Sequence, residues 1–352
     1  MKRGRWCWVL LFVWMLGCQS ESTAVAPEGG EPVVIGKRFE IRSEILNETR
    51  PLLIATPQPY SPDGGPYPVL YLLDGDYHFQ HVSGIVNFLY QQGRIPRMIV
   101  VAVPNTDRNW DLSPPSDAEL DVRFVPRRGG ADAFLRFFSD ELMPYVEKDY
   151  PTRPYRILVG HSLGGAFAVH ALATRPELFN AYIVIDANLQ WNNGGLVSQA
   201  EAFLAKTEEL QADLYLTATS ESVAEHASKL AEVLEEKAPR EFRWRFKVMP
   251  EEDHGSIPHR SIYLGLEAIF DGWRLANPIE LYDKGGLAAI HRHFEEGGKR
   301  FGYERKTSAF VVSMVIHGLM QAGRLEEAAT VMFHDADRYP PLWNQLDAMA
   351  RR

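Results

Sequence analysis

The stretch Ile157-Leu158-Val159-Gly160-His161-Ser162-Leu163-Gly164-Gly165 decides how this chain folds. A short apolar run ends at Gly160, and Ser162 then stands between two glycines in the pattern G-x-S-x-G. The alanine-rich segment that follows has the composition of a buried helix. A nucleophile elbow needs this layout, because the chain turns sharply from strand to helix and the glycines leave room for the strained turn. We therefore predict that Ser162 is a nucleophile at the end of a β-strand.

Short apolar runs alternate with helical stretches on both sides of this motif. The runs predict strands over residues 39–43, 51–55, 69–73, 97–103, 156–159, 181–185, 214–219 and 243–248, the first two antiparallel. Amphipathic patterns predict helices over residues 131–145 and 222–236. This alternation predicts an α/β fold with a mostly parallel sheet covered by helices on both faces. The active site of such a sheet lies at the carboxyl ends of its strands.

A serine nucleophile needs a histidine base, which follows the serine and an acidic residue along the chain in this fold. His254 stands in an acidic loop directly after the strand predicted at residues 243–248 and before a helix. It is therefore the predicted base, and His259 is the alternative. His170 lies inside the elbow helix, and we expect it to be a packed core or surface histidine.

The acidic partner of the histidine is harder to place. Glu221 ends the penultimate predicted strand, where this fold usually carries its acid, and is the first choice. A carboxylate at the start of a helix is also favoured by the helix dipole, which explains Glu221 without catalysis. Glu225 and Asp186, which ends the strand after the elbow, are the competitors.

Two backbone N–H groups are expected to form an oxyanion hole. One belongs to Leu163, the residue after the nucleophile, and the other comes from the loop after an earlier strand. The run over residues 69–73 ends in an acidic turn in which Gly75 lets the backbone come close. Asp76 is therefore the predicted second donor.

Taken in order, the motifs resemble those of an esterase family of the α/β-hydrolase fold. That family includes enterochelin-esterase-like enzymes, S-formylglutathione hydrolases, feruloyl esterases and mycolyl transferases. The matching segments are residues 69–75, 104–114, 129–134, 141–147 and 160–165, within a resemblance over about residues 35–275. The resemblance implies hydrolysis of a small or medium carboxylic ester through an acyl-enzyme, without a metal or an organic cofactor.

The resemblance also implies a site mouth shaped by Arg108 and Asp111, although an exposed ion pair explains them equally well. Trp191 is expected to line the substrate pocket. The acid position matches the family poorly, and some members work with little help from an acid, so a Ser–His dyad is a further alternative.

Two other functions compete with a general esterase. A siderophore-ester hydrolase needs a basic pocket for a catecholate anion, for which Arg108, Arg123, Arg127 and Arg128 are candidates. A non-catalytic envelope lipoprotein that binds proteins through its helical tail is the alternative from another class. The intact serine, histidine and glycine set argues against it, because binding places no demand on those residues.

The N-terminus reads as a targeting segment. Residues 1–5 are basic and residues 6–16 are apolar, a length typical of export rather than of a membrane span. Cys18 follows a small residue, as in bacterial lipoprotein signals whose cysteine is lipidated. We predict a signal peptide over residues 1–17 and a lipid-anchored envelope protein that faces the periplasm. Cleavage by an ordinary signal peptidase and an uncleaved anchor are alternatives.

Composition and the C-terminal pattern complete the organisation. The formal net charge of −9 argues against a nucleic-acid partner, and two cysteines, one inside the signal, exclude a disulfide framework or a cysteine zinc site. We predict a linker over residues 18–36, an esterase domain over 37–276 and a helical tail over 277–352. The tail resembles one tetratricopeptide helix pair. One repeat cannot form a solenoid, so we expect packing against the esterase domain, with a protein partner as the alternative.

Overall fold

The computed structural model describes residues 30–61 and 65–334, with the backbone alone for residues 221–224 and 334. The predicted signal segment and Cys18 lie outside the described residues. Of the described residues, 30–34 belong to a unit separate from the body that begins at Ile35, and the following description concerns that body. Among the described residues, no helix is long and apolar enough to cross a membrane.

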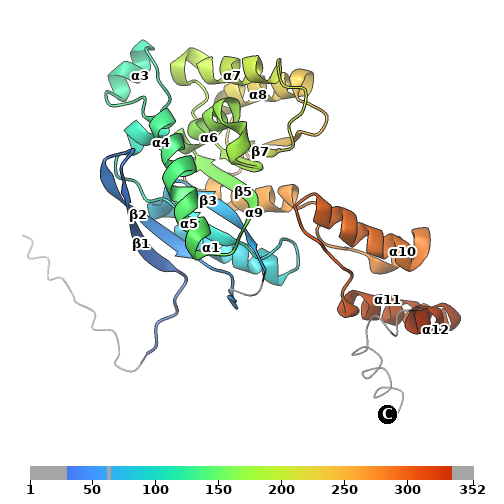
Figure 1. The fold of residues 1–352 in the computed structure, drawn as a ribbon. Helices are drawn as coiled ribbons and strands as arrows, with labels where there is room; N and C mark the ends of the chain where they lie inside the picture. Colours follow the sequence, from blue (N-terminus) through green and yellow to red (C-terminus); the bar gives the residue numbers. More distant parts are fainter. Residues whose placement is uncertain (1–29, 62–64, 335–352) are drawn as a thin grey trace, which may run out of the picture. The chain divides into compact units, whose positions relative to one another are not determined.

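An eight-stranded sheet forms the centre of the fold (Figure 1). Its order is β1-β2-β4-β3-β5-β6-β7-β8, antiparallel from β1 to β4 and parallel from β4 to β8. The mostly parallel sheet that the sequence predicts is confirmed. The strands are β1 (Lys37–Ser43), β2 (Glu48–Ala55), β3 (Tyr67–Leu72), β4 (Ile99–Ala102), β5 (Thr152–His161), β6 (Ala181–Ile185), β7 (Asp213–Ala218) and β8 (Arg243–Val248).

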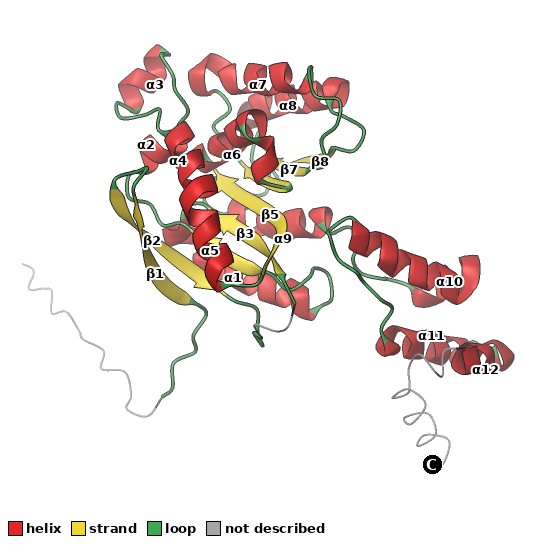
Figure 2. Ribbon diagram, viewed as in Figure 1, coloured by secondary structure: helices red, strands yellow, loops and turns green. Residues whose placement is uncertain are grey.

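Helices cover both faces of this sheet (Figure 2). Side chains that alternate along each strand feed two separate cores, because successive residues of a strand point to opposite faces. One core lies against α4 to α8, and the other lies against α1 and α9. The helices of this part are α1 (Gly75–Gln91), α2 (Arg108–Leu112), α3 (Glu119–Phe124), α4 (Ala131–Phe137), α5 (Met143–Asp149), α6 (Leu163–Thr174), α7 (Trp191–Leu204), α8 (Glu221–Lys237) and α9 (Ile257–Ile269).

The segment predicted as one helix over residues 131–145 is interrupted. A π-helical turn, Phe138–Leu142, joins α4 to α5. Phe138 and Leu142 are fully buried in this turn. A π turn shifts the register of the helix face by a fraction of a turn, a change that amphipathic spacing alone does not reveal. A short 3-10 helix, Pro176–Leu178, follows α6.

The described residues after Ala276 form helices and no strand. They are α10 (Pro278–Lys299), α11 (Ala309–Gln321) and α12 (Leu325–His334). These helices share a small core of their own, which includes Ile290, Val312 and Leu319. The predicted helix pair falls on α11 and α12, and its likeness to a tetratricopeptide repeat stays a prediction.

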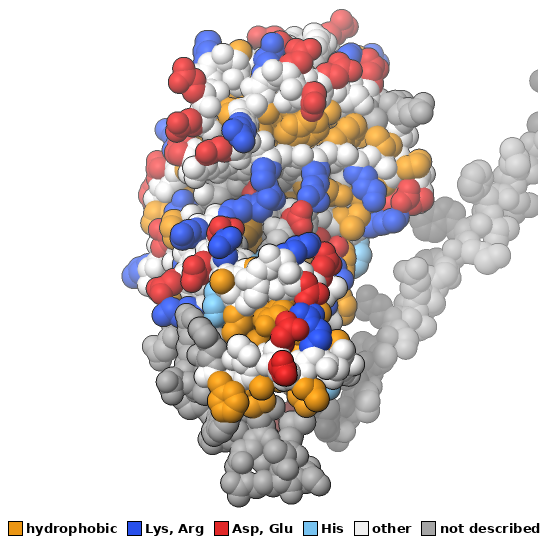
Figure 3. All heavy atoms as spheres, turned by 90° about the vertical axis from the view of Figure 1, so that its right-hand side faces the viewer, with side chains coloured by type: hydrophobic (Ala, Val, Ile, Leu, Met, Phe, Trp, Pro, Cys, Tyr) orange, Lys and Arg blue, Asp and Glu red, His pale blue; other side chains and the backbone are white. Residues whose placement is uncertain are grey.

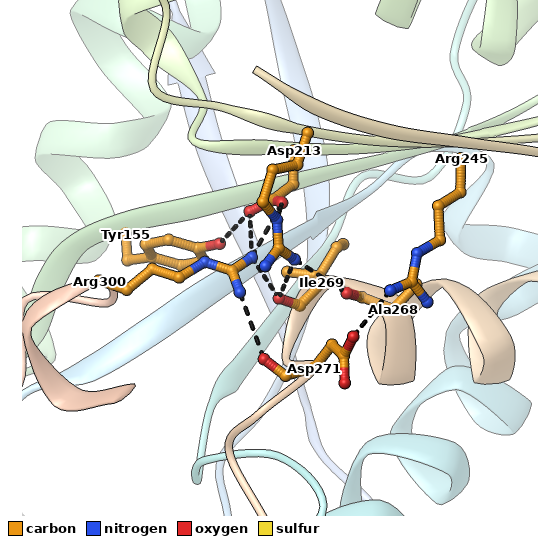
Figure 4. Close-up of polar contacts among 8 residues, drawn as sticks. Tyr155, Asp213, Arg245, Ala268, Ile269, Asp271 and Arg300 are labelled. Atoms are coloured by element: carbon orange, nitrogen blue, oxygen red, sulfur yellow. Dashed lines mark hydrogen bonds and ion pairs between the residues drawn. The ribbon is translucent and has the colours of Figure 1, made fainter. Parts of the chain in front are cut away.

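The segment after α10 packs against the central sheet through an ion-pair network (Figure 4). Asp213, the buried first residue of β7, accepts hydrogen bonds from Arg300 Nη2 at 2.9 Å and from Arg243 Nε at 2.8 Å. The ring of Phe301 lies 5.4 Å from Tyr155 in β5. These contacts lie at the amino ends of the strands. The beginning of the helical tail therefore packs at the end of the sheet opposite the carboxyl ends of the strands.

Strand β8 forms one edge of the sheet and carries Arg243, Arg245 and Lys247 at alternate positions. Charged side chains on an edge strand oppose pairing with another chain. Figure 3 shows one face of the molecule, on which Lys and Arg side chains gather in a band.

We predict that Asp213→Ala lowers the free energy of unfolding by about 2 kcal/mol, because it leaves two partly buried arginines without their carboxylate. Arg245→Ala is the matched control, since its partner Asp271 is exposed and such pairs contribute about 0–1 kcal/mol. Urea denaturation followed by circular dichroism measures both changes. Equal losses in the two variants would contradict the structural role given to Asp213.

Candidate active site

The turn at Ser162 holds the serine in a strained conformation, with φ 59° and ψ −117°. It lies directly between β5 and α6. A Cβ on Gly160 would stand 2.1 Å from the carbonyl oxygen of Gly164, so only glycine fits there. The Ser162 N–H donates to the carbonyl of Ile185 at 2.9 Å, and the Asn188 N–H donates to the Ser162 carbonyl at 3.1 Å. The strand–turn–helix layout predicted from the sequence is therefore present.

His254 lies in the loop between β8 and α9 and contacts a buried carboxylate. Its Nδ1 is 2.6 Å from Asp186 Oδ2. The other oxygen of Asp186 accepts hydrogen bonds from the Thr219 N–H at 2.8 Å and from the Thr219 hydroxyl at 3.0 Å. These hydrogen bonds fix the position of the carboxylate. Because Asp186 bonds to Nδ1, Nε2 is the ring nitrogen of His254 that can bind another group.

Asp186 thus takes the position that the sequence analysis gave first to Glu221. An imidazole Nδ1 accommodates one such partner, and Asp186 occupies it. Because β6 lies next to β5 in the sheet, the end of β6 is beside the nucleophile, whereas β7 is one strand further away. Glu221 begins α8, and its side chain is outside the described residues. Glu225 is exposed and pairs with Lys229 at 2.8 Å.

The predicted oxyanion donors stand at two helix starts. Leu163 is the first residue of α6 and Asp76 is the second residue of α1, so neither N–H has a partner inside its helix. The Asp76 carboxylate accepts the Asn105 N–H at 2.8 Å, and the neighbouring Tyr77 lines the cavity around Ser162. Both positions suit a developing negative charge, and their role stays a prediction.

The cavity that contains Ser162 has a volume of about 890 Å³. Among the predicted pocket residues, Arg108 lines it. The Arg108 guanidinium donates to both oxygens of the buried Asp74, at 2.6 and 3.0 Å. The lining residues are Asp74, Tyr77, His78, His81, Arg108, His161, Ser162, His254, Gly255, Ser256, Pro258 and His259.

Two predicted pocket residues are structural instead. Asp111 is buried and pairs with the buried Arg50, and burial raises the pKa of its carboxyl. Trp191 is also buried, and its Nε1–H donates to the Pro114 carbonyl at 3.0 Å. Neither lines the cavity, so their assignment to the pocket was wrong. Both residues hold the loops beside the site in place.

Three of the four basic residues proposed for an anionic substrate lie elsewhere. Arg127 pairs with Asp107 at 2.9 Å, and Arg128 donates from Nε to the Ser116 carbonyl at 2.7 Å. Arg123 lies over the ring of Phe124. None of the three lines the cavity.

Five imidazoles form a continuous row along the cavity, which we call the histidine row. The distances between neighbouring ring centroids are 4.4 Å for His254 and His161, and 5.8 Å for His161 and His78. They are 5.2 Å for His78 and His81, and 5.2 Å for His81 and His259. The alternative base His259 is therefore at the far end from His254. His170 is not in the row but packs between Asp132 and Gln199, as expected.

Sequence analysis missed three members of this row. His161 is the variable residue of the G-x-S-x-G motif, and His78 and His81 are spaced to share one face of α1. Burial lowers the pKa of His161 and of His81 to about 4, and it also lowers the pKa of His78. These imidazoles are neutral near pH 7. No group of His, Cys, Asp or Glu within the described ranges is arranged to hold a metal ion.

We predict that the protein loses stability as the pH falls from about 6.5 to about 4, a window set by the unfolded and folded pKa values of His161 and His81. In this window the unfolded state binds more protons, so acid favours unfolding. Thermal melts from pH 4 to 7 measure the effect. His161→Gln should flatten the pH dependence, whereas His317→Gln, an exposed change in α11, should not. An unchanged slope in His161→Gln would contradict the assignment.

Known proteins share this architecture. Ferri-bacillibactin esterase BesA of Bacillus subtilis is 31% identical over 201 residues, which cover 52% of this chain and 69% of that protein. A siderophore enterobactin esterase of Emericella nidulans is 36% identical over 123 residues, 31% of this chain and 41% of the relative. The structure of an IroE-like serine hydrolase from Shewanella oneidensis aligns with a TM-score of 0.67 at 26% identity, over 85% of this chain and 99% of that one.

The family model described as "Putative esterase" matches residues 43–257, more than half of the chain. The match contains the Ser162 elbow, Asp186 and His254. This chain therefore belongs to the putative esterase family, and it is a serine carboxylic-ester hydrolase of the α/β-hydrolase fold.

Proposed function

We propose that Ser162, His254 and Asp186 hydrolyse a small or medium ester through an acyl-enzyme. The observation that carries this proposal is the Asp186–His254 hydrogen bond at the cavity that Ser162 also lines. Chain order supports it as well, because serine, acid and histidine follow one another as in other α/β-hydrolases.

The proposed reaction has two halves. Nε2 of His254 takes the proton of the Ser162 hydroxyl while its oxygen attacks the ester carbonyl, and the Leu163 and Asp76 N–H groups hold the oxyanion. His254 then protonates the leaving alcohol. Water repeats the cycle, which releases the acid and restores the serine. One imidazole serves as base and as acid near neutral pH.

We predict that the wild type hydrolyses p-nitrophenyl acyl esters and that Ser162→Ala lowers kcat by about 10⁴-fold or more, since no other nucleophile stands at the elbow. Spectrophotometric rates from short to long acyl chains measure the activity and the size of the acyl pocket. Activity that survives in Ser162→Ala, with the fold intact by circular dichroism, would exclude this nucleophile.

Asp186 and Glu221 are separated by a second pair of variants. We expect Asp186→Asn to lower kcat by about 10²- to 10⁴-fold, because an amide no longer fixes the tautomer and charge of His254. Glu221→Gln should change kcat by less than about threefold, as expected for a residue that is not part of the proposed Ser162–His254–Asp186 triad. The same ester assay decides the question, and the opposite ranking would return the acid role to Glu221.

A siderophore ester is the second candidate substrate, because one relative named above is a siderophore enterobactin esterase and the other is a ferri-bacillibactin esterase. The cavity offers one arginine, and Asp74 already neutralises it. Incubation with ferric and iron-free siderophore esters, followed by chromatography of the products, tests this candidate.

We also propose an exported, lipid-anchored protein, supported by the basic and apolar segments that precede Cys18. A protein partner at the helical tail is a further proposal. Its support is the separate small core of α10 to α12 and the exposed Phe310 and Leu325.

A further inference from the structure

A second cavity, of about 540 Å³, lies beside the one that contains Ser162. The linings of the two cavities share Tyr77, His81 and His259, so a substrate bound at Ser162 has this second cavity as its neighbour. It lies between α1 and α9, which pack against each other on one face of the sheet (Figure 2). We call it the side groove, and its lining residues are Tyr77, Gln80, His81, Gly84, Ile85, Phe88, His259 and Tyr263.

The side groove is walled by aromatic rings. Tyr77 and Phe88 are large side chains left 76% and 49% exposed. The Phe88 and Tyr263 rings face each other across the two helices, with centroids 6.4 Å apart and planes 36° apart. Exposed aromatic side chains around a concavity are a common feature of ligand sites, because they gain contact area when an apolar ligand covers them.

Residues along one face of α1 line one side of the groove. Tyr77, His81, Gly84 and Phe88 follow one another at helical spacing on the same face. A Cβ at Gly84 would meet no atom within 4 Å, so packing does not require glycine at this helix-interior position. Glycine lowers helix stability relative to alanine. Gly84 instead leaves an open space on the helix face between Tyr77 and Phe88.

The charges around both cavities cancel. Their lining contains one cation, Arg108, and one carboxylate, Asp74, and these two are hydrogen-bonded to each other. The buried imidazoles of the row are neutral near pH 7 because burial lowers their pKa values. Asp76 and Asp253, exposed nearby, would repel an anion. An uncharged ligand therefore fits this lining, whereas an anion would find no unpaired cation there.

We propose that the side groove binds an uncharged aromatic group of the ester, so that neutral aromatic esters are the preferred substrate class. This inference rests on the proposed function, because it takes Ser162 as the point from which the substrate extends. The aromatic group belongs to the acyl or to the alcohol part, and the choice of substrates distinguishes these two.

The test compares esters of similar intrinsic reactivity. Ethyl 2-naphthylacetate carries the ring on the acyl part, 2-(2-naphthyl)ethyl acetate carries it on the alcohol, and ethyl acetate has none. We expect kcat/KM to rise about tenfold or more for one of the naphthyl esters over ethyl acetate, as the contact of an aromatic group with aromatic walls permits. A ring-carboxylated analogue of that ester should lose most of the gain.

Two variants locate the effect. Phe88→Ala removes one aromatic side chain of the groove, and Gly84→Phe fills the space beside the glycine. Each change should therefore lower the ratio of kcat/KM for the naphthyl ester to kcat/KM for ethyl acetate towards one. Phe310→Ala is the matched control, because Phe310 is 72% exposed on α11 and is outside both cavities. It should keep the wild-type ratio. Thermal melts confirm that each variant is folded.

The outcomes separate the two levels of the proposal. If the wild type hydrolyses ethyl or p-nitrophenyl acetate but shows no naphthyl preference, or keeps it in both Phe88→Ala and Gly84→Phe, the side groove is not the subsite. Preference for the carboxylated analogue would overturn the uncharged class. If no ester is cleaved at all, the proposed function itself fails.

Discussion

The strained turn at Ser162 is the constraint on which the rest of the site depends. A non-glycine residue at φ 59° and ψ −117° costs on the order of 1–3 kcal/mol and persists only where its surroundings hold it. Here β6 and the loop that follows it supply this support. The carbonyl of Ile185, the last residue of β6, accepts the Ser162 N–H, and the Asn188 N–H donates to the Ser162 carbonyl. Asp186 stands between those two residues. The same hydrogen bonds that maintain the strain therefore place the carboxylate that orients His254.

Charged side chains in and around the cavity are paired with opposite charges, and this pairing determines which interactions the cavity offers a substrate. Arg50 of β2 pairs with Asp111 of α2, and Arg108, the first residue of α2, pairs with Asp74 at the start of α1. A buried charge without a partner would be destabilising by several kcal/mol, so each of these ions is committed to its neighbour. What the cavity offers a substrate is then hydrogen bonds, aromatic surface and imidazoles, with no spare charge.

The fold and the nucleophile could be predicted because their signals are local. Apolar runs indicated the strands, 181–185 and 243–248 with the observed bounds, and the glycines around Ser162 indicated the elbow. The contact of Asp186 with His254 could not be predicted, because the sequence does not show that β6 rather than β7 lies beside β5. Trp191 and Asp111 were misplaced for a related reason. Their types suit a pocket, but the tertiary fold buries both.

The histidine row also depends on tertiary structure, since β5, α1, α9 and the loop after β8 each contribute to it. Its first contact bears on catalysis. A positive charge on His161, whose ring centroid is 4.4 Å from that of His254, would oppose the imidazolium that the proposed reaction forms on His254. At an effective dielectric constant of about 20, that repulsion would be about 4 kcal/mol. Burial keeps His161 uncharged near neutral pH. In the proposed reaction, the proton that His254 takes from Ser162 therefore has no charged imidazole as its nearest neighbour.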